Sequence, residues 1–456
     1  MQNGKTRTEY DSLGPVTVPA EALWGAQTQR AIDNFQLSPH RFSRTFLRAL
    51  GLVKAAAAQA NRECGVLHDA VAQAVATAAH RVADGEVDDA FPVDVFQTGS
   101  GTSTNMNANE VIARLASEAS GQTIHPNDHV NASQSSNDVI PTSIHVAVTL
   151  ALEEQLLPAL RALRGAIQDR GETLNAYVKT GRTHLMDAMP VRLDQELGAW
   201  AAQLELAEER LVGVLPRLAE LAQGGTAVGS GVNAPEGFAT TFCAALSEIS
   251  GKAFQPARNH FAALSCQDTA VEASGNVRTL AVALMKIAND LRWMNSGPLA
   301  GLGEIELPAI QPGSSIMPGK VNPVIPEAVA MAAAQIMGHD TTVAIAGQSG
   351  NFQLNVMLPV IAHNLLASID LSARACAAMV PVIEGFQVRA DSLMRALEKN
   401  PILVTALNRE IGYDKGAAIA KRAYREGRSV MEVALEDSGL DEARLRQLLD
   451  PRALTG

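Results

Sequence analysis

The spacing of apolar residues in the middle of the chain constrains the fold more than any other feature. Between residues 193 and 221, apolar side chains recur at steps of three and four, the period of one face of an α-helix. A second such run covers residues 277–294, and a less regular one covers 148–167. At about 1.5 Å per residue, such helices are rods of about 40 Å, and their narrow apolar stripes predict a bundle. The same stripes can also face another subunit.

Composition favours an all-α fold with several domains. Aromatic residues make up only 4% of the chain while Ala and Leu are abundant, whereas strands draw on aromatic and β-branched residues. The 456 residues, of which 47% are hydrophobic, suffice for about three domains. Breaks in the helical pattern near Gln134 and Asp391 predict domains over residues 1–134, 135–391 and 392–456.

Charge and hydropathy narrow the classes of partner. The formal net charge of −11 argues against nucleic acid, because phosphate binding needs clustered Lys and Arg. A small molecule or a protein is the expected partner, and an anionic substrate would need a locally positive site. Residues 1–10 lack the apolar run of a secretory signal, so we expect a cytoplasmic protein. The longest stretch without Asp, Glu, Lys or Arg, residues 341–369, is too polar to span a bilayer, and no membrane segment is expected.

Potential metal ligands and disulfide partners do not cluster in the sequence. The four cysteines lie far apart and form no C-x-x-C pair, which predicts free thiols rather than a disulfide framework or a zinc site. They are Cys64, Cys243, Cys266 and Cys376. His125 and His129 are four residues apart but lack the intervening Glu of a metalloprotease helix. We therefore expect no metal site.

Polar, glycine-rich stretches separate the predicted helices. They cover residues 98–107, 125–141, 181–190, 224–235 and 312–323. They combine hydroxyl and amide side chains with glycines, a composition typical of backbone nests that bind anions. These stretches are the candidate site loops.

Two of these loops carry glycine patterns that resemble nucleotide motifs only in part. Residues 313–323, GSSIMPGKVNP, have five residues between the glycines instead of four, and Val321 stands where a phosphate loop needs Ser or Thr. The composition suits a mobile lid better, although a surface loop without function remains open. Residues 224–231 follow a long helix rather than a strand, which excludes a dinucleotide fingerprint. They are either a helix terminus near a site or purely structural.

His184 lies in a polar turn, Gly181-Arg182-Thr183-His184, where its pKa can reach physiological pH. It is therefore a candidate acid or base. A lone histidine is more often structural, and both interpretations stay open from the residues alone.

Taken together, the loops resemble one known family. Residues 313–323 closely resemble the signature loop of the fumarase and aspartase superfamily, and further similar blocks extend over nearly the whole chain. These blocks are WGAQTQR at 24–30, TGSGT at 98–102, HPND at 125–128, SSND at 135–138, GRTH at 181–184 and GYDK at 412–415. Gly319 is similar to fumarases, since aspartases typically carry Ala there. The chain is thus identified as a member of the class II fumarate hydratase family.

The resemblance implies an all-α, three-domain fold with a central long-helix bundle, forming a 20-helix core in a homotetramer whose sites are shared between three subunits. It implies reversible hydration of fumarate to L-malate by anti addition of water, without a cofactor. The alternative within the superfamily is an aspartate ammonia-lyase. An inactive structural relative is disfavoured because Ser314, Lys320, Asn322 and His184 are all retained.

The resemblance also implies roles for individual residues. Ser314 would be the base on the mobile loop, and His184 would manage the second proton with Glu327 as its partner. The residues expected to bind substrate are Ser100, Gly101, Thr102, Ser135, Ser136, Asn137, Thr183, Ser315, Lys320, Val321 and Asn322. The residues that resemble a second, non-catalytic anion site are His125, Pro126, Asn127 and Asp128.

Overall fold

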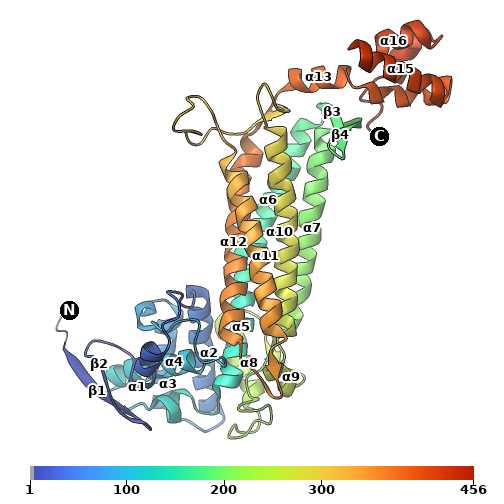
Figure 1. Ribbon diagram of the computed structural model, residues 1–456. Helices are drawn as coiled ribbons and strands as arrows, with labels where there is room; N and C mark the ends of the chain where they lie inside the picture. Colours follow the sequence, from blue (N-terminus) through green and yellow to red (C-terminus); the bar gives the residue numbers. More distant parts are fainter. Residues whose placement is uncertain (1–4) are drawn as a thin grey trace. The chain divides into compact units, whose positions relative to one another are not determined.

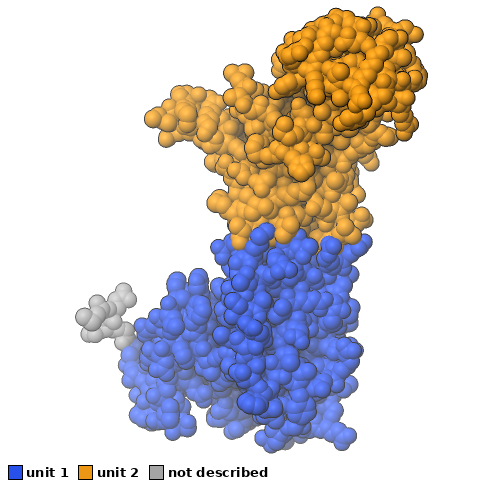
Figure 2. All heavy atoms as spheres, turned by 45° about the vertical axis from the view of Figure 1, so that its right-hand side comes forward, with its two compact units in different colours: residues 1–158, 209–279, 335–373 blue, residues 159–208, 280–334, 374–456 orange. Residues whose placement is uncertain are grey.

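A computed structural model describes residues 5–456, so the first four residues of the N-terminal segment lie outside the described part of the chain. Helices dominate, and the strands form only short two-stranded sheets (Figure 1), which confirms the all-α prediction. The chain divides into two compact units (Figure 2). Unit 1 comprises the described part of Met1–Pro158 with Glu209–Thr279 and Gln335–Ala373. Unit 2 comprises Ala159–Glu208, Leu280–Ala334 and Arg374–Gly456. The three-domain division stays a prediction.

Unit 1 is built around helix α2, Arg44–Glu63, an alanine-rich helix whose small side chains allow close packing on several neighbours. Gly51 makes the closest approach, because a Cβ there would lie 2.6 Å from the backbone nitrogen of Ala83 on α3. The other helices that lie wholly within this unit are α1 (Ala26–Asn34), α3 (Asp69–Ala83), α4 (Thr102–Ser120), α5 (Ser136–Ala151), α8 (Phe238–Ser250) and α9 (His260–Ser265). Short helical turns lie at Asp88–Ala90 (η1), Pro126–Val130 (η2) and Leu152–Leu156 (η3).

The strands of unit 1 form three small ribbons. Strands β1 (Thr6–Asp11) and β2 (Gly14–Pro19) pair antiparallel, with Thr6 opposite Pro19. The other pairs are β5 (Glu220–Leu221) with β6 (Gln255–Pro256) and β8 (Gly350–Asn351) with β9 (Leu354–Asn355). These ribbons close loops between helices and do not form a core sheet.

Five further long helices lie along the chain, and the apolar stripes predicted from the sequence fall mainly on the first three of them. They are α6 (Leu157–Leu174), α7 (Leu193–Leu218), α10 (Asp268–Met294), α11 (Val324–Gly347) and α12 (Leu358–Gly385). Within unit 2 their segments lie side by side as a bundle (Figure 1). Trp200 on α7 is fully buried and donates its indole N–H to Asp290 on α10 across 3.2 Å. The stripe that the sequence predicts thus faces the interior of this bundle.

The remainder of unit 2 consists of short elements. Two antiparallel pairs join β3 (Val178–Thr183) with β4 (Met186–Arg192), and β7 (Ile305–Glu306) with β10 (Gln387–Val388). The C-terminal helices are α13 (Ala390–Glu398), η4 (Pro401–Leu407), α14 (Asn408–Ile411), α15 (Tyr413–Glu426), α16 (Val430–Asp437) and α17 (Glu442–Leu448). From η4 onward they enclose their own apolar cluster, which includes Leu407, Ile419 and Leu445.

Helix α12 passes a length and composition test for a membrane span, with a mean hydropathy of 1.5 over its most apolar window. Half of that window is buried inside the protein, and core helices of soluble proteins pass the same test. The helix also carries Asp370 and Arg374 in its middle, where charged side chains are expensive in a bilayer.

Candidate active site

The loop of residues 313–323 directs two backbone donors at Ser314. The backbone N–H groups of Ile316 and Met317 donate to the Ser314 Oγ across 3.2 and 3.0 Å. Such donors favour negative charge on the oxygen that accepts them. The loop therefore suits a serine that must give up its proton.

The loop closes on itself at its two ends. The N–H of Gly313 donates to the carbonyl of Lys320 across 2.9 Å, and the Asn322 amide donates to the carbonyl of Gly313 across 2.5 Å. Glycine is required at 313, because a Cβ would lie 2.2 Å from the Lys320 carbonyl oxygen. Gly319 has φ +81°, a conformation that other residues adopt only with strain. Both glycines serve the closed form of the loop.

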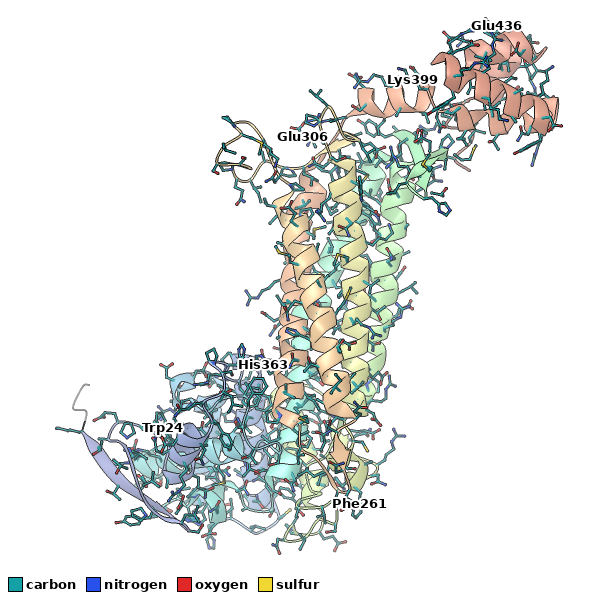
Figure 3. The ribbon with its side chains drawn as sticks, viewed as in Figure 1. Trp24, Phe261, Glu306, His363, Lys399 and Glu436 are labelled. Carbon is teal, nitrogen blue, oxygen red and sulfur yellow. The ribbon has the colours of Figure 1, made fainter. Side chains whose placement is uncertain are left out.

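Four predicted site residues, Lys320, Val321, Asn322 and Glu327, line one cavity of about 840 Å³ in unit 2. Glu327 lies in the first turn of α11, where its N–H donates to the carbonyl of Pro323 across 3.1 Å. The same cavity is lined by Arg292 and Arg389 and by Glu306, so with Lys320 and Glu327 its wall carries three cations and two carboxylates, a small excess of positive charge for an anionic ligand. Glu306, labelled in Figure 3, pairs with Arg389 across 2.8 Å.

His184 occupies the tight turn between β3 and β4. Thr183 pairs with Met186, and the two residues between them, His184 and Leu185, have φ of +55° and +60°. Positive φ at both central positions is the geometry of a two-residue hairpin turn. Thr183 and His184 are exposed there, and within residues 5–456 no hydrogen bond or ion pair joins His184 to Glu327. The partnership of these two residues stays a prediction.

A buried ion cluster, which the sequence did not reveal, supports this hairpin. Glu304 is 3% exposed, and its carboxylate lies 2.7 Å from both the Lys179 ammonium and the Arg182 guanidinium of β3. Lys179 also pairs with Glu196 across 2.8 Å. The Glu304 contacts are ion pairs by distance, although their angles lie outside hydrogen-bond geometry. Because a buried lysine and a partly buried arginine flank one buried carboxylate, ion pairs help to hold the strand that leads to His184.

In unit 1, the start of α4 carries the first group of predicted substrate residues. The hydroxyls of Ser100 and Thr102 are hydrogen-bonded at 2.7 Å. Gly101 is the N-cap residue, with φ +73°, and a Cβ there would lie 2.9 Å from Ile140 on α5. The glycine therefore lets the start of α4 approach α5.

The start of α5 carries the second group. The Ser135 Oγ accepts from the N–H of Asn137 across 3.2 Å, and the N–H of Ser135 donates to Asp138 across 2.9 Å, which completes a capping box. The Asn137 amide donates to the carbonyl of Ala227 across 2.8 Å. Ser136 follows the cap directly. Hydroxyl and amide groups at a helix N-terminus suit a carboxylate ligand.

Asp138 anchors the glycine-rich segment 224–231 to α5. Its buried carboxylate accepts from the backbone N–H groups of Gly224 and Thr226 across 3.0 and 2.8 Å. Burial raises the pKa of this carboxyl to about 6, against the opposing effect of its backbone donors. A Cβ at Gly229 would lie 2.8 Å from Phe261, labelled in Figure 3. These contacts give the segment a structural role.

The predicted second anion segment forms the π-helical turn η2. The Nδ1 of His125 accepts from the N–H of Asp128 across 3.1 Å, and the Nδ1 of His129 accepts from the N–H of His125 across 2.9 Å. The side chains of His125 and Asp128 are exposed. The turn packs against α4. An anion-binding role for it stays a prediction.

Within residues 5–456, the structure has no group of three or more His, Cys, Asp or Glu side chains that could hold a metal ion. The four cysteines are free, with Cys243 and Cys376 buried. Neither unit by itself holds the whole set of predicted site residues: unit 1 holds those before residue 138 and unit 2 holds those from Thr183 onward.

Comparisons with known proteins identify the family of the chain. A family model described as Lyase matches residues 14–338, and one described as Fumarase C C-terminus matches 403–456. Fumarate hydratase class II 2 of Pseudomonas aeruginosa is 59% identical over 99% of this chain and 98% of its own length. Fumarate hydratase class II of Mycobacterium tuberculosis is 51% identical over 96% and 93%. The crystal structure of class II fumarase from Schistosoma mansoni has a TM-score of 0.96 at 36% identity, covering 99% of both chains. The chain therefore belongs to the class II fumarate hydratase family of lyases.

Proposed function

We propose that this protein is a fumarate hydratase that interconverts fumarate and L-malate. The observation that carries the proposal is the Ser314 Oγ, which accepts two backbone N–H groups inside a loop closed by Gly313 and Asn322. Dehydration of malate removes a proton from the carbon next to a carboxylate, which is a very weak acid. Only a strong base held by preorganised donors does this at useful rates.

The reaction balances with the side chains that this chain carries. After its own proton has passed to solvent, the Ser314 oxygen takes the proton from C3 of malate as an alkoxide, and negative charge builds on the adjacent carboxylate. Lys320 and Asn322 bind that carboxylate and stabilise the charge as it forms. His184, oriented by Glu327, supplies the proton with which the C2 hydroxyl leaves as water. In the reverse direction the same groups add water across the double bond of fumarate.

The residues of unit 1 bind and orient the substrate. Hydroxyls at the start of α4 and the capped N-terminus of α5 offer donors to the second carboxylate. The base, the lysine and the histidine come from unit 2. We infer a homotetramer in which each site takes its residues from three subunits. Exposed apolar side chains on the long helices, such as Met331 at 69% and Trp293 at 53%, support burial against other copies. The free thiols fit the reducing cytoplasm, where we place the enzyme.

Substrate choice is tested by following fumarate absorbance with purified protein. L-Malate without ammonia is expected to yield fumarate, and L-aspartate is expected to yield none. The named relatives are fumarate hydratases, which disfavours the aspartate ammonia-lyase alternative. Fumarate formed from aspartate alone would replace the hydratase proposal with that alternative.

Site sharing is tested by complementation between two inactive variants, Ser314→Ala and the double variant Ser136→Ala/Asn137→Ala. After the two are co-refolded, some sites combine an intact Ser314 from one chain with an intact Ser136 from another, so part of the activity is expected to return. Light scattering is expected to give the mass of four chains. If the mixture stays as inactive as each variant alone, each site belongs to a single chain.

A further inference from the structure

Lys54 is a buried lysine that the reaction described above does not use. It lies in the middle of α2, is 0% exposed, and is surrounded in sequence by apolar residues. Its ammonium donates to the Asn131 Oδ1 and to the Gln134 Oε1, each across 3.1 Å. Burial lowers the pKa of Lys54 to about 7, with Asp138 acting in the opposite direction. Burying an ammonium group costs free energy that an apolar side chain at this position would not cost. The lysine is therefore expected to have a role that an apolar residue could not fill.

A continuous set of hydrogen bonds leads from this lysine to the predicted substrate site. The Asn131 Oδ1 also accepts from the Asn105 Nδ2 across 3.2 Å. The same Asn105 Nδ2 donates to the Ser136 Oγ across 2.9 Å. Asn105 is 1% exposed and Ser136 is 9% exposed, so water does not compete for these bonds. All four residues belong to unit 1.

The Lys54 ammonium and the Gln134 carbonyl together fix the direction of the bonds in this set. A charged ammonium has donors only, so Asn131 must turn its oxygen toward Lys54. The Asn131 amide nitrogen donates instead to the carbonyl of Gln134 across 3.2 Å. Asn105 must then present its NH₂ group to Asn131, and the second hydrogen of that group reaches Ser136. The Ser136 oxygen is thereby an acceptor on its buried side, and its own hydrogen is free to be donated outward.

We propose that Lys54 is a positioning residue that sets the direction of hydrogen bonding at Ser136, so that the serine hydroxyl donates to a substrate carboxylate. This inference rests on the proposed function, which makes Ser136 a contact of the dicarboxylate. A carboxylate has only acceptors, so a serine that donated inward would face it with lone pairs. Without the lysine, the Asn131 amide is oriented only by the Gln134 carbonyl and by the Asn105 and Asn109 amides, so the direction of the hydrogen bond at Ser136 is held less firmly.

The first test replaces the lysine by Lys54→Met, which has similar length and no donor. Because the substitution removes hydrogen bonds donated by a charged group, KM for L-malate is expected to rise about tenfold, with a smaller change in kcat. Lys54→Gln restores an amide donor and is expected to recover part of the loss. The matched control is Lys252→Met, whose ammonium pairs with Glu153 rather than with a predicted substrate residue, and it is expected to keep the wild-type KM.

The second test asks whether Lys54 acts through Ser136. In a Ser136→Ala background, Lys54→Met is expected to cause no further rise in KM, whereas a merely structural role would give additive effects. Asn105→Leu removes the hydrogen bond to Ser136 itself. It is expected to raise KM for L-malate in the wild-type background but not in the Ser136→Ala background. It tests the same connection if Lys54→Met does not fold. A wild-type protein that is inactive on malate would refute the proposed function itself. Wild-type activity with additive effects, or with an unchanged KM in the folded variants, would refute only the role of Lys54.

Discussion

Gly313→Ala tests whether closure of the 313–323 loop activates Ser314. The added Cβ would lie 2.2 Å from the Lys320 carbonyl oxygen and 2.8 Å from the Asn322 nitrogen, so the two ends of the loop must separate. Separation gives up two hydrogen bonds, from the Gly313 N–H to Lys320 and from the Asn322 amide to Gly313. At about 1 kcal/mol each, the closed loop loses about 2 kcal/mol, or roughly thirtyfold in population.

We expect kcat for L-malate to fall roughly thirtyfold, because the hydrogen bonds that close the loop hold Ser314, Lys320 and Asn322 in one arrangement. The melting temperature is expected to stay the same, since the loop is largely exposed. Gly319→Ala is the matched control: a Cβ there meets nothing within 4 Å, and the strain at φ +81° costs about 1 kcal/mol, or roughly fivefold. Steady-state kinetics and thermal melts of both variants provide the measurement. Wild-type kcat in Gly313→Ala, or a greater loss in Gly319→Ala, would refute the reasoning.

Three further outcomes follow from buried groups. The pKa of Lys54 is 10.5 in the unfolded chain and about 7 in the folded protein, so between pH 7 and pH 10.5 the unfolded chain binds more protons. The free energy of unfolding measured in urea should therefore rise above pH 7 by up to about 1.4 kcal/mol per pH unit. Lys54→Met is expected to remove this rise. Glu304→Gln removes one of the two carboxylates paired with buried Lys179 and also the partner of Arg182, and it is expected to cost about 3 kcal/mol in chemical unfolding. The exposed pair at Glu306, changed to Gln, contributes under about 1 kcal/mol. Burial raises the pKa of the Cys243 thiol to about 12, so iodoacetamide should label exposed Cys266 and spare Cys243 in peptide mass spectrometry.

The long helices are predictable from the sequence because their apolar spacing is a local property. The stripe over residues 193–221 corresponds to α7, Leu193–Leu218. The run over 277–294 and helix α10 end together at Met294. The helix begins earlier, at Asp268, where an acidic first turn marks its start before the apolar stripe begins. The irregular run over 148–167 has a structural cause: the π-helical turn Leu152–Leu156 interrupts the α-helical period between α5 and α6.

The site loops were also visible in the sequence, since hydroxyls, amides and glycines cluster locally in them. The buried ions were not. Lys54 is a single charge in an apolar helix, and its partners lie 77 and 80 residues further along the chain. Glu304 likewise becomes informative only when β3 brings Lys179 and Arg182 to it. A charge isolated within an apolar run is the one local signal that could have marked Lys54.

The measurement that tests the account most directly is the turnover of L-malate to fumarate by Ser314→Ala. Ser12→Ala, which changes an exposed serine in the turn between β1 and β2, is the control for the substitution itself. The account predicts that Ser314→Ala folds, binds malate and loses at least about a hundredfold in kcat, equivalent to about 3 kcal/mol, while Ser12→Ala keeps the wild-type rate. A Ser314→Ala enzyme that turns over malate at the wild-type rate would show that the proton is taken by another group.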